Sequence, residues 1–342
     1  MKPLSRTETV LDQEARVALL RQKRTYPEKP ARIEVIETHM SWVFLTPRHA
    51  FKLKKPVRYD YLDYSTLAAR KKNCEEEVRL NQRLAPGVYR GIVALTLDTR
   101  GAARIEGQGE VVDWLVKMRR LPAERMLDYL IRHQSLGPVE THAVAEVLAH
   151  FYRECAALKI GAGEYLSRYE RNVHVNHDAL ANPLYGLPVA LVEAVHAAQK
   201  KFLQCTPALL DRRTAEERIV EGHGDLRPEH VCLESPPVIF DRLEFNRAFR
   251  VVDAVEELAF LAMECERLGA PRIEEEFFAV YRRITGDYPP PQLVCFYKAY
   301  RACVRARLAI WHLHDAAENA WPRWRHVAEE YLLLAESYTG KF

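Results

Sequence analysis

Two aspartates flank a short β-prone segment in the second half of the chain. Asp225 lies in the run HGDLRPEHV, and Asp241 directly follows an apolar run at residues 238–240. This run is separated from the apolar run at 231–233 by Glu-Ser-Pro-Pro, a turn-like spacer, so we expect the two runs to pair as an antiparallel hairpin. Pairing would bring residues 223–230 close to Asp241. The sequence therefore predicts a compact site with two acids, two histidines and one arginine.

These residue types match the requirements of phosphoryl transfer from ATP. That reaction uses an Asp that accepts the proton of the acceptor hydroxyl, a second Asp that holds Mg²⁺, another metal ligand, and a cation near the transferring group. We assign Asp225 as the catalytic base and Asp241 as a metal ligand. Arg227 is assigned as the cation, and His223 is a further catalytic residue of the same loop. The order of catalytic loop, hairpin and metal-binding Asp is also that of the protein kinases.

The runs HGDLRPEHV and IFDRLEFN resemble the active-site segments of the aminoglycoside phosphotransferase-like family, in particular a bacterial branch of it. The resemblance spans roughly residues 34–314. It implies a protein-kinase-like fold, ATP with Mg²⁺ or Mn²⁺ as cofactors, and a small-molecule acceptor. The family's loop reads HGDLxxxN, but His230 stands at the position of the metal-binding Asn. Because Mg²⁺ prefers oxygen ligands to imidazole, His230 either reshapes the metal site or removes one metal, and Glu244 could supply the missing oxygen.

Two other functions remain open from the same residues. A metallohydrolase would use His223, Asp225, His230 and Asp241 to hold Zn²⁺ or Mn²⁺ and activate water, but this interpretation leaves the first half of the chain unexplained. A nucleotide-binding pseudokinase, acting as a sensor or scaffold, is suggested by His230 and by the absence of a GxGxxG loop. The retained pair of aspartates favours an active phosphotransferase.

An antiparallel sheet is predicted upstream of the site, with its first strands at residues 33–36, 41–45 and 50–54. Lys52 lies on the third strand, where the resembled fold places the lysine that holds the nucleotide phosphates. Lys54 points to the same face of the strand and is the alternative. Ser41 begins the second strand, beside the turn that replaces a glycine-rich loop, and donors of this turn could bind phosphate.

A helix over residues 66–84, with Ser65 as its N-cap, is predicted after these strands. In the resembled fold this helix supplies the Glu that pairs with the lysine of the third strand. Glu77 lies about two turns from Leu84 and therefore on the packed side, so we choose it. Glu76 is the alternative.

The predicted sheet is completed by strands at residues 92–97 and 111–118. After these strands, the resemblance implies a hinge between the lobes. In the resembled fold, backbone groups of this hinge form hydrogen bonds with the edge of the adenine. Met118, Arg119 and Leu121 are the expected nucleotide-binding residues there, with simple core packing as the alternative for Met118.

The fold class is thus α+β and bilobal. Residues 1–121 form an N-lobe with a leading helix at 10–21, an antiparallel sheet and one packed helix. Residues 122–342 form a mostly helical C-lobe that includes the catalytic loop and the metal-binding hairpin.

Three further segments of the C-lobe carry specific expectations. The run at residues 165–176 is polar, aromatic and irregular, and could line the acceptor pocket. Lys298, Arg301 and Arg305 lie on one face of a helix, which is either a solvated stripe, the favoured interpretation, or a surface for an anionic acceptor. Asp253 is expected to be a buried structural residue.

Composition agrees with an ordinary globular protein of 342 residues, with a formal charge of +3 and 28% charged residues, and not with a nucleic-acid-binding polycation. The seven cysteines include no CxxC pair, which favours free thiols in a reducing compartment. No uninterrupted apolar run suits a signal peptide or a membrane span, so we expect a cytoplasmic protein without membrane or nucleic-acid partners. Some relatives carry a P-loop domain after the kinase-like one, and no GxxxxGK[ST] run is present here.

Overall fold

The computed structural model describes residues 11–161, 163–314 and 318–342, and these form two compact units. The first unit contains the described residues up to Ala123 together with Val238–Arg247, and the second contains Glu124–Pro237 and the rest of the chain from Ala248. The predicted boundary at residue 121 assigned the metal-binding segment to the helical part, whereas the structure groups that segment with the sheet. Val10 of the predicted leading helix lies outside the described residues.

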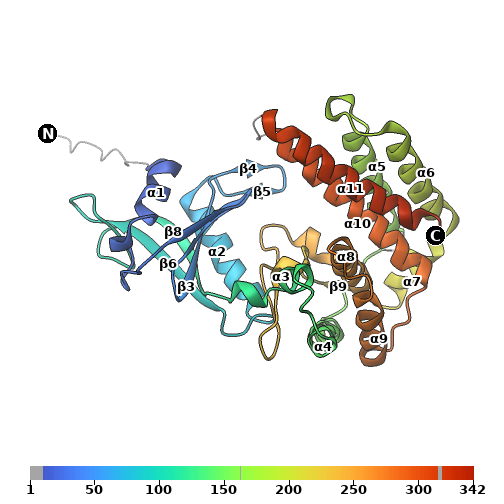
Figure 1. Ribbon diagram of the computed structural model, residues 1–342, viewed down its shortest axis with the longest axis horizontal. Helices are drawn as coiled ribbons and strands as arrows, with labels where there is room; N and C mark the ends of the chain where they lie inside the picture. Colours follow the sequence, from blue (N-terminus) through green and yellow to red (C-terminus); the bar gives the residue numbers. More distant parts are fainter. Residues whose placement is uncertain (1–10, 162, 315–317) are drawn as a thin grey trace. The chain divides into compact units, whose positions relative to one another are not determined.

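The first unit is built on a six-stranded sheet with the order β1-β2-β3-β8-β6-β7, in which every neighbouring pair is antiparallel (Figure 1). Its strands are β1 (Glu34–Glu37), β2 (Ser41–Leu45), β3 (His49–Lys54), β6 (Tyr89–Leu97), β7 (Ala103–Ile105) and β8 (Glu110–Arg119). Alternation along β3 sends Phe51 and Leu53 into a hydrophobic core. Lys52 and Lys54 point to the opposite face, toward α2.

Shorter elements complete this unit. They are α1 (Gln13–Leu20), a two-stranded hairpin of β4 (Arg58–Tyr59) and β5 (Leu62–Asp63), α2 (Leu67–Asn81) and β11 (Val238–Ile239). The N-cap of α2 is Thr66, whose hydroxyl accepts a hydrogen bond from the Ala69 N–H at 3.1 Å, so the prediction of Ser65 was wrong by one residue. Ser65 instead donates its N–H and hydroxyl to Asp63, which holds it in the preceding turn.

The second unit is mostly helical. Its helices are α3 (Leu127–Arg132), α4 (Pro138–Glu154), α5 (Glu164–Leu180), α6 (Val189–Cys205), α7 (Pro207–Ala215), α8 (Ala254–Arg267), α9 (Ile273–Thr285), α10 (Pro291–Trp311) and α11 (Trp321–Thr339). The short strands β9 (Ile219–Glu221) and β12 (Val251–Asp253) pair antiparallel, and β10 (Val231–Cys232) follows the loop that carries Asp225. None of the described helices is both long enough and apolar enough to span a bilayer. The seven cysteines, all within the described residues, are free thiols.

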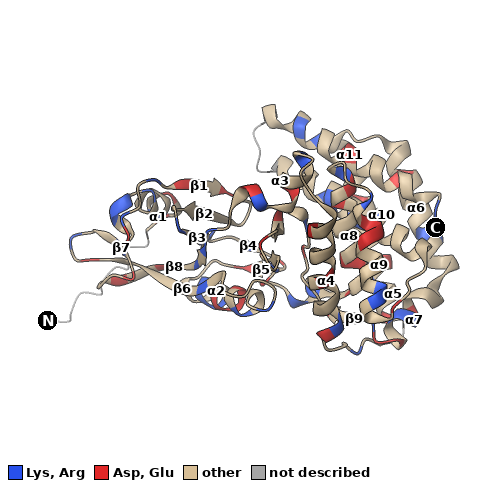
Figure 2. Cartoon of the chain, turned by 60° about the horizontal axis from the view of Figure 1, so that its bottom comes forward, with Lys and Arg blue, Asp and Glu red and all other residues tan. Residues whose placement is uncertain are grey.

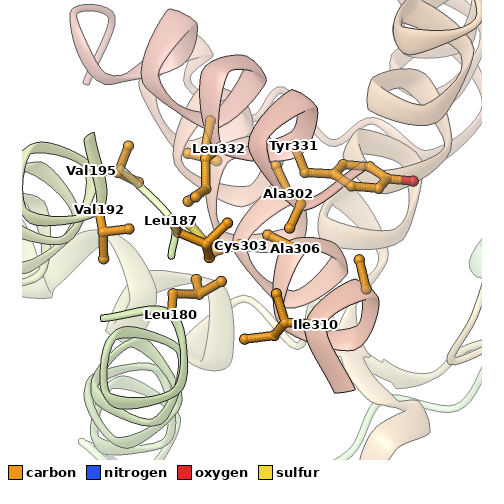
Figure 3. Packing of buried hydrophobic residues seen from close by; sticks show 14 of the residues in the cluster. Leu180, Leu187, Val192, Val195, Ala302, Cys303, Ala306, Ile310, Tyr331 and Leu332 are labelled. Carbon is orange, nitrogen blue, oxygen red and sulfur yellow. The ribbon is translucent and has the colours of Figure 1, made fainter. Parts of the chain in front are cut away.

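A hydrophobic core of the helical unit joins α5, α6, α8, α10 and α11. Figure 3 shows Leu180 of α5, Val195 of α6, Ile310 of α10 and Leu332 of α11 around one apolar interior. Small residues of α10, such as Ala302, allow α11 to pack closely against it. This packing fixes α5 and α6 relative to each other.

The expectation that residues 165–176 are irregular was wrong, because they lie within α5. Tyr165 and Tyr169 are buried, and both hydroxyls donate to Glu256 of α8. Aromatic residues spaced four apart share one face of a helix, so the side of α5 that carries Tyr165 and Tyr169 packs into the interior.

The prediction of a solvated basic stripe on α10 was also wrong. Lys298 lies 2.6 Å from Glu266, Arg301 lies 2.7 Å from Glu256, and Arg305 lies 3.2 Å from Glu264. Figure 2 shows basic residues of α10 and acidic residues of α8 where the two helices lie side by side. A charged stripe at helical spacing therefore serves here as one half of a largely buried helix interface.

Candidate active site

Lys52 of β3 is the centre of an ion-pair cluster in the sheet unit. Its Nζ lies 3.0 Å from Glu77 Oε1 of α2 and 2.6 Å from Asp241 Oδ1, two residues beyond β11. Burial lowers the pKa of Lys52, but the charges of Asp241 and Glu77 outweigh it and raise the pKa well above its ordinary value. The ammonium is therefore positively charged at neutral pH. Its contacts bring together Lys52, Glu77 and Asp241, all three of which were assigned to the site from the sequence.

Lys54 has a different environment on the same face of β3. Its side chain is 0% exposed, and Nζ lies 2.6 Å from Glu77 Oε2 while also donating to Glu244. The Tyr64 hydroxyl donates to the same oxygen of Glu244. Burial raises the pKa of Glu244, but Lys54 and then Lys52 more than offset this and hold it below its usual range. Glu244, assigned as a metal ligand from sequence, is thus engaged with Lys54 and Tyr64.

The two candidate glutamates of α2 have clearly different surroundings. Glu77 is fully buried and bridges Lys52 and Lys54, one through each carboxylate oxygen. Glu76 pairs with Arg79 one turn later, at 2.6 Å, on a much more exposed side of the helix. Of the two, it is Glu77 whose carboxylate contacts the lysine of the third strand.

The segment after β11 is fixed to the sheet unit by backbone hydrogen bonds. The N–H of Ile239 donates to the Leu84 carbonyl at 3.0 Å, and the N–H of Arg242 donates to Asn81 Oδ1 at 2.8 Å. The N–H of Asp241 donates to the Tyr89 hydroxyl at 3.1 Å. These contacts explain why residues 238–247 group with the sheet.

Asp241 also has φ of 62°, a left-handed conformation that few residues other than glycine adopt. Aspartate tolerates this region better than most side chains, yet such conformations concentrate at functional sites. The Asp241 side chain is 37% exposed, the highest value in the cluster of Lys52, Lys54, Glu77, Asp241 and Glu244. Its carboxylate is therefore the one most accessible to a ligand.

In the helical unit, the loop that carries Asp225 is held by a buried carboxylate. Glu257 of α8 accepts hydrogen bonds from the backbone N–H groups of His223, at 2.8 Å, and of Gly224. Tyr152 donates its hydroxyl to the same carboxylate at 2.9 Å. A Cβ at Gly222 would lie 2.2 Å from Glu257 Oε2, so only glycine permits this approach. Burial raises the pKa of Glu257, while the two N–H donors lower it and limit the rise.

Asp225 lies among cationic groups at the end of this loop. Its backbone N–H donates to Nδ1 of the fully buried His223 at 3.3 Å, and Arg227 Nε lies 3.4 Å from Asp225 Oδ2. Burial raises the pKa of Asp225, but Arg227, followed by His230 and Arg305, lowers it below the ordinary value. With its side chain 35% exposed, Asp225 is an accessible and ionised carboxylate.

His230 is largely buried and is fixed by the same loop. Its Nδ1 lies 2.8 Å from the carbonyl oxygen of Asp225, and because a carbonyl can only accept, Nδ1 must carry the proton. Nε2 is then the ring nitrogen that could bind a metal. This tautomer is the one that metal-binding histidines commonly adopt when a backbone carbonyl orients them.

The expected nucleotide-binding residues lie at two ends of the sheet. Ser41 is buried, and its N–H donates to the Thr38 hydroxyl at 3.0 Å, which closes a tight turn between β1 and β2. Met118 is buried between its strand partners on β3 and β6, in agreement with a core role. Arg119 is the last residue of β8, and Leu121, two residues later, is half-buried.

Sequence reasoning missed two residues that position these groups, Tyr64 and Glu257. For Glu257 a signal existed, since Glu256 and Glu257 stand together in a strongly apolar helix, where buried acids need specific partners. For Tyr64 no local signal distinguishes it from neighbouring tyrosines. Asp253, expected to be structural, is buried and pairs with Arg213 at 2.6 Å, as expected.

Comparison with other proteins gives both sequence relatives and solved structures of similar fold. No protein-family model matches the chain. The chain is 35% identical over 285 residues to an uncharacterised protein of Mycobacterium bovis and to one of Mycobacterium tuberculosis. Each alignment covers 81% of this chain but 54% of the relative, so the chain spans about half the length of these proteins.

Two solved structures resemble the chain over nearly its whole length. Choline kinase from Cryptosporidium parvum matches with a TM-score of 0.52 and 10% identity, covering 95% of this chain and 93% of that one. The AMP-bound spectinomycin phosphotransferase matches with a TM-score of 0.53 and 11% identity, covering 92% and 97%. At such low identity the likeness establishes the fold, with its antiparallel-sheet unit and its helical unit. The chain therefore belongs to the protein-kinase-like fold that aminoglycoside phosphotransferases and choline kinases share, as the resemblance implied.

Proposed function

We propose that the chain is an ATP-dependent phosphotransferase that moves the γ-phosphoryl group to a hydroxyl of a small molecule. The observation that carries this proposal is the pairing of Lys52 with both Glu77 and Asp241. In kinases the lysine of the third strand pairs with a helix glutamate and the phosphates, while a separate Asp holds the metal. Kinases of this fold that act on small molecules, such as choline kinase and spectinomycin phosphotransferase, support the same class of reaction.

The sheet unit is proposed to bind the nucleotide. Lys52 would exchange part of its contact with Asp241 for the nucleotide phosphates, which a permanently charged ammonium can do. Met118, Arg119 and Leu121 are the proposed neighbours of the adenine, at the end of β8. The N–H of Ser41 closes the turn by donating to Thr38, and other backbone N–H groups of this turn are the proposed phosphate donors.

The residues available for a divalent metal fit this assignment in part. Asp241 offers an accessible carboxylate, the ligand that Mg²⁺ prefers, and His230 offers Nε2, which suits Mn²⁺ better. Because Glu244 is engaged with Lys54 and Tyr64, we now propose that it supports the lysine cluster and is not a metal ligand. When bound, the metal would neutralise charge on the β- and γ-phosphates.

The loop of the helical unit is proposed to act on the acceptor. Asp225 accepts the hydroxyl proton as the acceptor oxygen forms its bond to the γ-phosphorus and the bond from that phosphorus to the β-phosphate oxygen breaks, releasing ADP. The lowered pKa of Asp225 keeps it ionised at neutral pH. Arg227 would stabilise charge on the transferring group, and the buried His223 acts as a positioning residue through the Asp225 N–H.

The test separates nucleotide binding from turnover. Thermal stabilisation by ATP with Mg²⁺ or Mn²⁺ is measured for the wild type, Asp241→Ala and Asp225→Asn, and ADP release is followed over a panel of hydroxyl-bearing small molecules. We expect Asp241→Ala to lose the stabilisation by ATP. Asp225→Asn should keep it and lose about 10²–10⁴-fold in turnover. Weaker nucleotide binding with unchanged turnover in Asp225→Asn would contradict the proposed role.

One observation favours a second candidate, a nucleotide-binding pseudokinase. His230 occupies the position of the expected metal-binding Asn and is fixed to the Asp225 carbonyl. If the chain is a pseudokinase, ATP should raise its thermal stability, and no acceptor of the panel should give ADP release. A His230→Asn variant that gains turnover would identify the histidine as the cause.

A further inference from the structure

A second group of metal-binding side chains lies on the outer face of the helical unit, near the end of α5. His174, His177 and Asp178 are spaced i, i+3 and i+4, which places them side by side on one helix face. One ligand atom from each lies within 4.8 Å of the other two. None of the three has a part in the proposed phosphoryl transfer.

Two distances within this group, each to a different oxygen of Asp178, are close to the spacing of ligand atoms in a tetrahedral metal centre. His174 Nε2 lies 3.3 Å from Asp178 Oδ2, and His177 Nδ1 lies 3.7 Å from Asp178 Oδ1. Around a tetrahedral Zn²⁺ with bonds of about 2.0–2.1 Å, neighbouring ligand atoms are about 3.3 Å apart. Side-chain rotations that bring these atoms from their separation of at most 4.8 Å to this spacing would place one oxygen of Asp178 and one nitrogen of each histidine around one ion.

A carboxylate from the neighbouring helix orients the central histidine. His177 Nε2 lies 2.9 Å from Glu193 Oε1 of α6, and the His177 ring stacks on His196 of α6 at 4.0 Å. Donation from Nε2–H to Glu193 leaves the lone pair on Nδ1, the atom that faces Asp178. Metal-binding histidines typically donate their second N–H to a carboxylate in this way, which makes the ring a better ligand.

The packing below the site holds α5 and α6 in this arrangement. Leu180 of α5 and Val192 and Val195 of α6 belong to the same core, and Figure 3 shows them with their side chains in one interior. The contact between His177 and Glu193 therefore depends on the core of the helical unit and not on nucleotide.

We propose that His174, His177 and Asp178 bind one Zn²⁺-class ion, with Glu193 as the carboxylate that orients His177. Two imidazole nitrogens and one carboxylate oxygen suit Zn²⁺ and neighbouring transition metals, whereas Mg²⁺ and Ca²⁺ favour all-oxygen sites. With neutral rings, Asp178 and Glu193 supply two negative charges, which balance a divalent ion. The exposed side of the group leaves the fourth position to water, and α6 would support the ion only through the contact of Glu193 with His177.

The experiment titrates ZnCl₂ into chelator-treated protein without nucleotide, by calorimetry, and repeats the titration with Co²⁺, whose absorption reports tetrahedral coordination. His174→Ala is the main variant, since this side chain is 69% exposed and its removal leaves the core intact. His326→Ala is the matched control. His326 and Glu330 form a similar exposed pair on α11, 3.3 Å apart, but the described residues provide no third ligand there.

We expect one Zn²⁺ per chain in the wild type and in His326→Ala, and at least 10-fold weaker binding in His174→Ala and in Asp178→Asn. Glu193→Gln should keep the stoichiometry but bind about 10-fold more weakly, since such outer carboxylates contribute about 10–100-fold in affinity. Equal affinity in the wild type and His174→Ala would overturn the proposal, because any bound ion would then lie elsewhere. Loss of the ion in Asp241→Ala, and not in His174→Ala, would overturn it in favour of a site at Asp241.

Discussion

Replacing Glu77 by Gln tests the central ion-pair cluster of the sheet unit. The substitution keeps the size of the side chain and removes its charge. Both carboxylate oxygens are engaged in the wild type, one with Lys52 at 3.0 Å and one with Lys54 at 2.6 Å. In the amide, one of the two lysines would face an NH₂ group, which cannot accept a hydrogen bond from the ammonium. We expect Glu77→Gln to destabilise the protein and to weaken nucleotide binding.

The size of the expected loss in the free energy of unfolding depends on the partners that Lys52 and Lys54 keep. Removing one partner of a buried ion pair typically costs about 3–5 kcal/mol, because the other charge is left without compensation. Here Lys52 keeps Asp241, and Lys54 keeps Glu244 and Tyr64. The expected loss in the free energy of unfolding is therefore about 3 kcal/mol, at the lower end of this range.

Glu76→Gln is the matched control, because it makes the same chemical change one residue earlier on the same helix. Glu76 pairs with Arg79 on a more exposed side, and such i, i+3 pairs contribute only about 0.2–0.5 kcal/mol. Urea unfolding followed by circular dichroism gives the stability of both variants, and thermal shift with ATP and Mg²⁺ gives nucleotide binding. The reasoning fails if Glu77→Gln lies within about 1 kcal/mol of the wild type, or if both variants lose the same amount.

Two further predictions concern the helical unit. Asp287 accepts from both terminal nitrogens of Arg213 at 2.6 Å, and although burial raises its pKa, Arg213 lowers it below the ordinary value. Its contribution to stability is therefore present above about pH 4 and lost as pH falls through the lower folded-state pKa. Asp287→Asn should cost about 3 kcal/mol at pH 7 in urea unfolding, with a difference that shrinks toward pH 3; a constant difference would contradict this origin. Asn176 is 2% exposed, and neither polar atom of its amide has a hydrogen-bond partner among the described residues, so Asn176→Leu should raise stability by about 1 kcal/mol in thermal unfolding. Asn172→Leu, which removes a hydrogen bond of 3.0 Å to Tyr300, is its control and should lower stability, and the same sign for both variants would refute the argument.

The parts of the site that local sequence could predict are those set by short-range rules. Alternation along β3 correctly placed Lys52 and Lys54 on one face, and helical spacing correctly placed Glu77 on the packed side of α2. The fold class followed from the motif order and is confirmed by the structural matches. These features depend on periodicity within a single strand or helix, which the sequence displays directly.

What the sequence could not supply was the partner of each charged group. Lys52 and Lys54 are equivalent by periodicity, and only the carboxylates that approach them from distant segments distinguish the partly accessible lysine from the fully buried one. Glu244 was assigned to metal because carboxylates near an active-site Asp are plausible ligands. Its engagement with Lys54 and Tyr64 depends on contacts across about 180–190 residues of sequence.

The same limit applies to α8, whose acidic residues organise much of the helical unit. Its periodicity predicts a helix, but periodicity does not say why three of its four glutamates should be buried. In the structure Glu257 holds the backbone of the loop that carries Asp225, Glu256 contacts Arg301 and two tyrosines of α5, and Glu264 pairs with Arg305. Each buried acid is matched by a cation or by several donors, as the cost of burying an unpaired charge requires. Because Arg305 also lowers the pKa of Asp225, the ion pairs between α8 and α10 help to hold the proposed base in its ionised form.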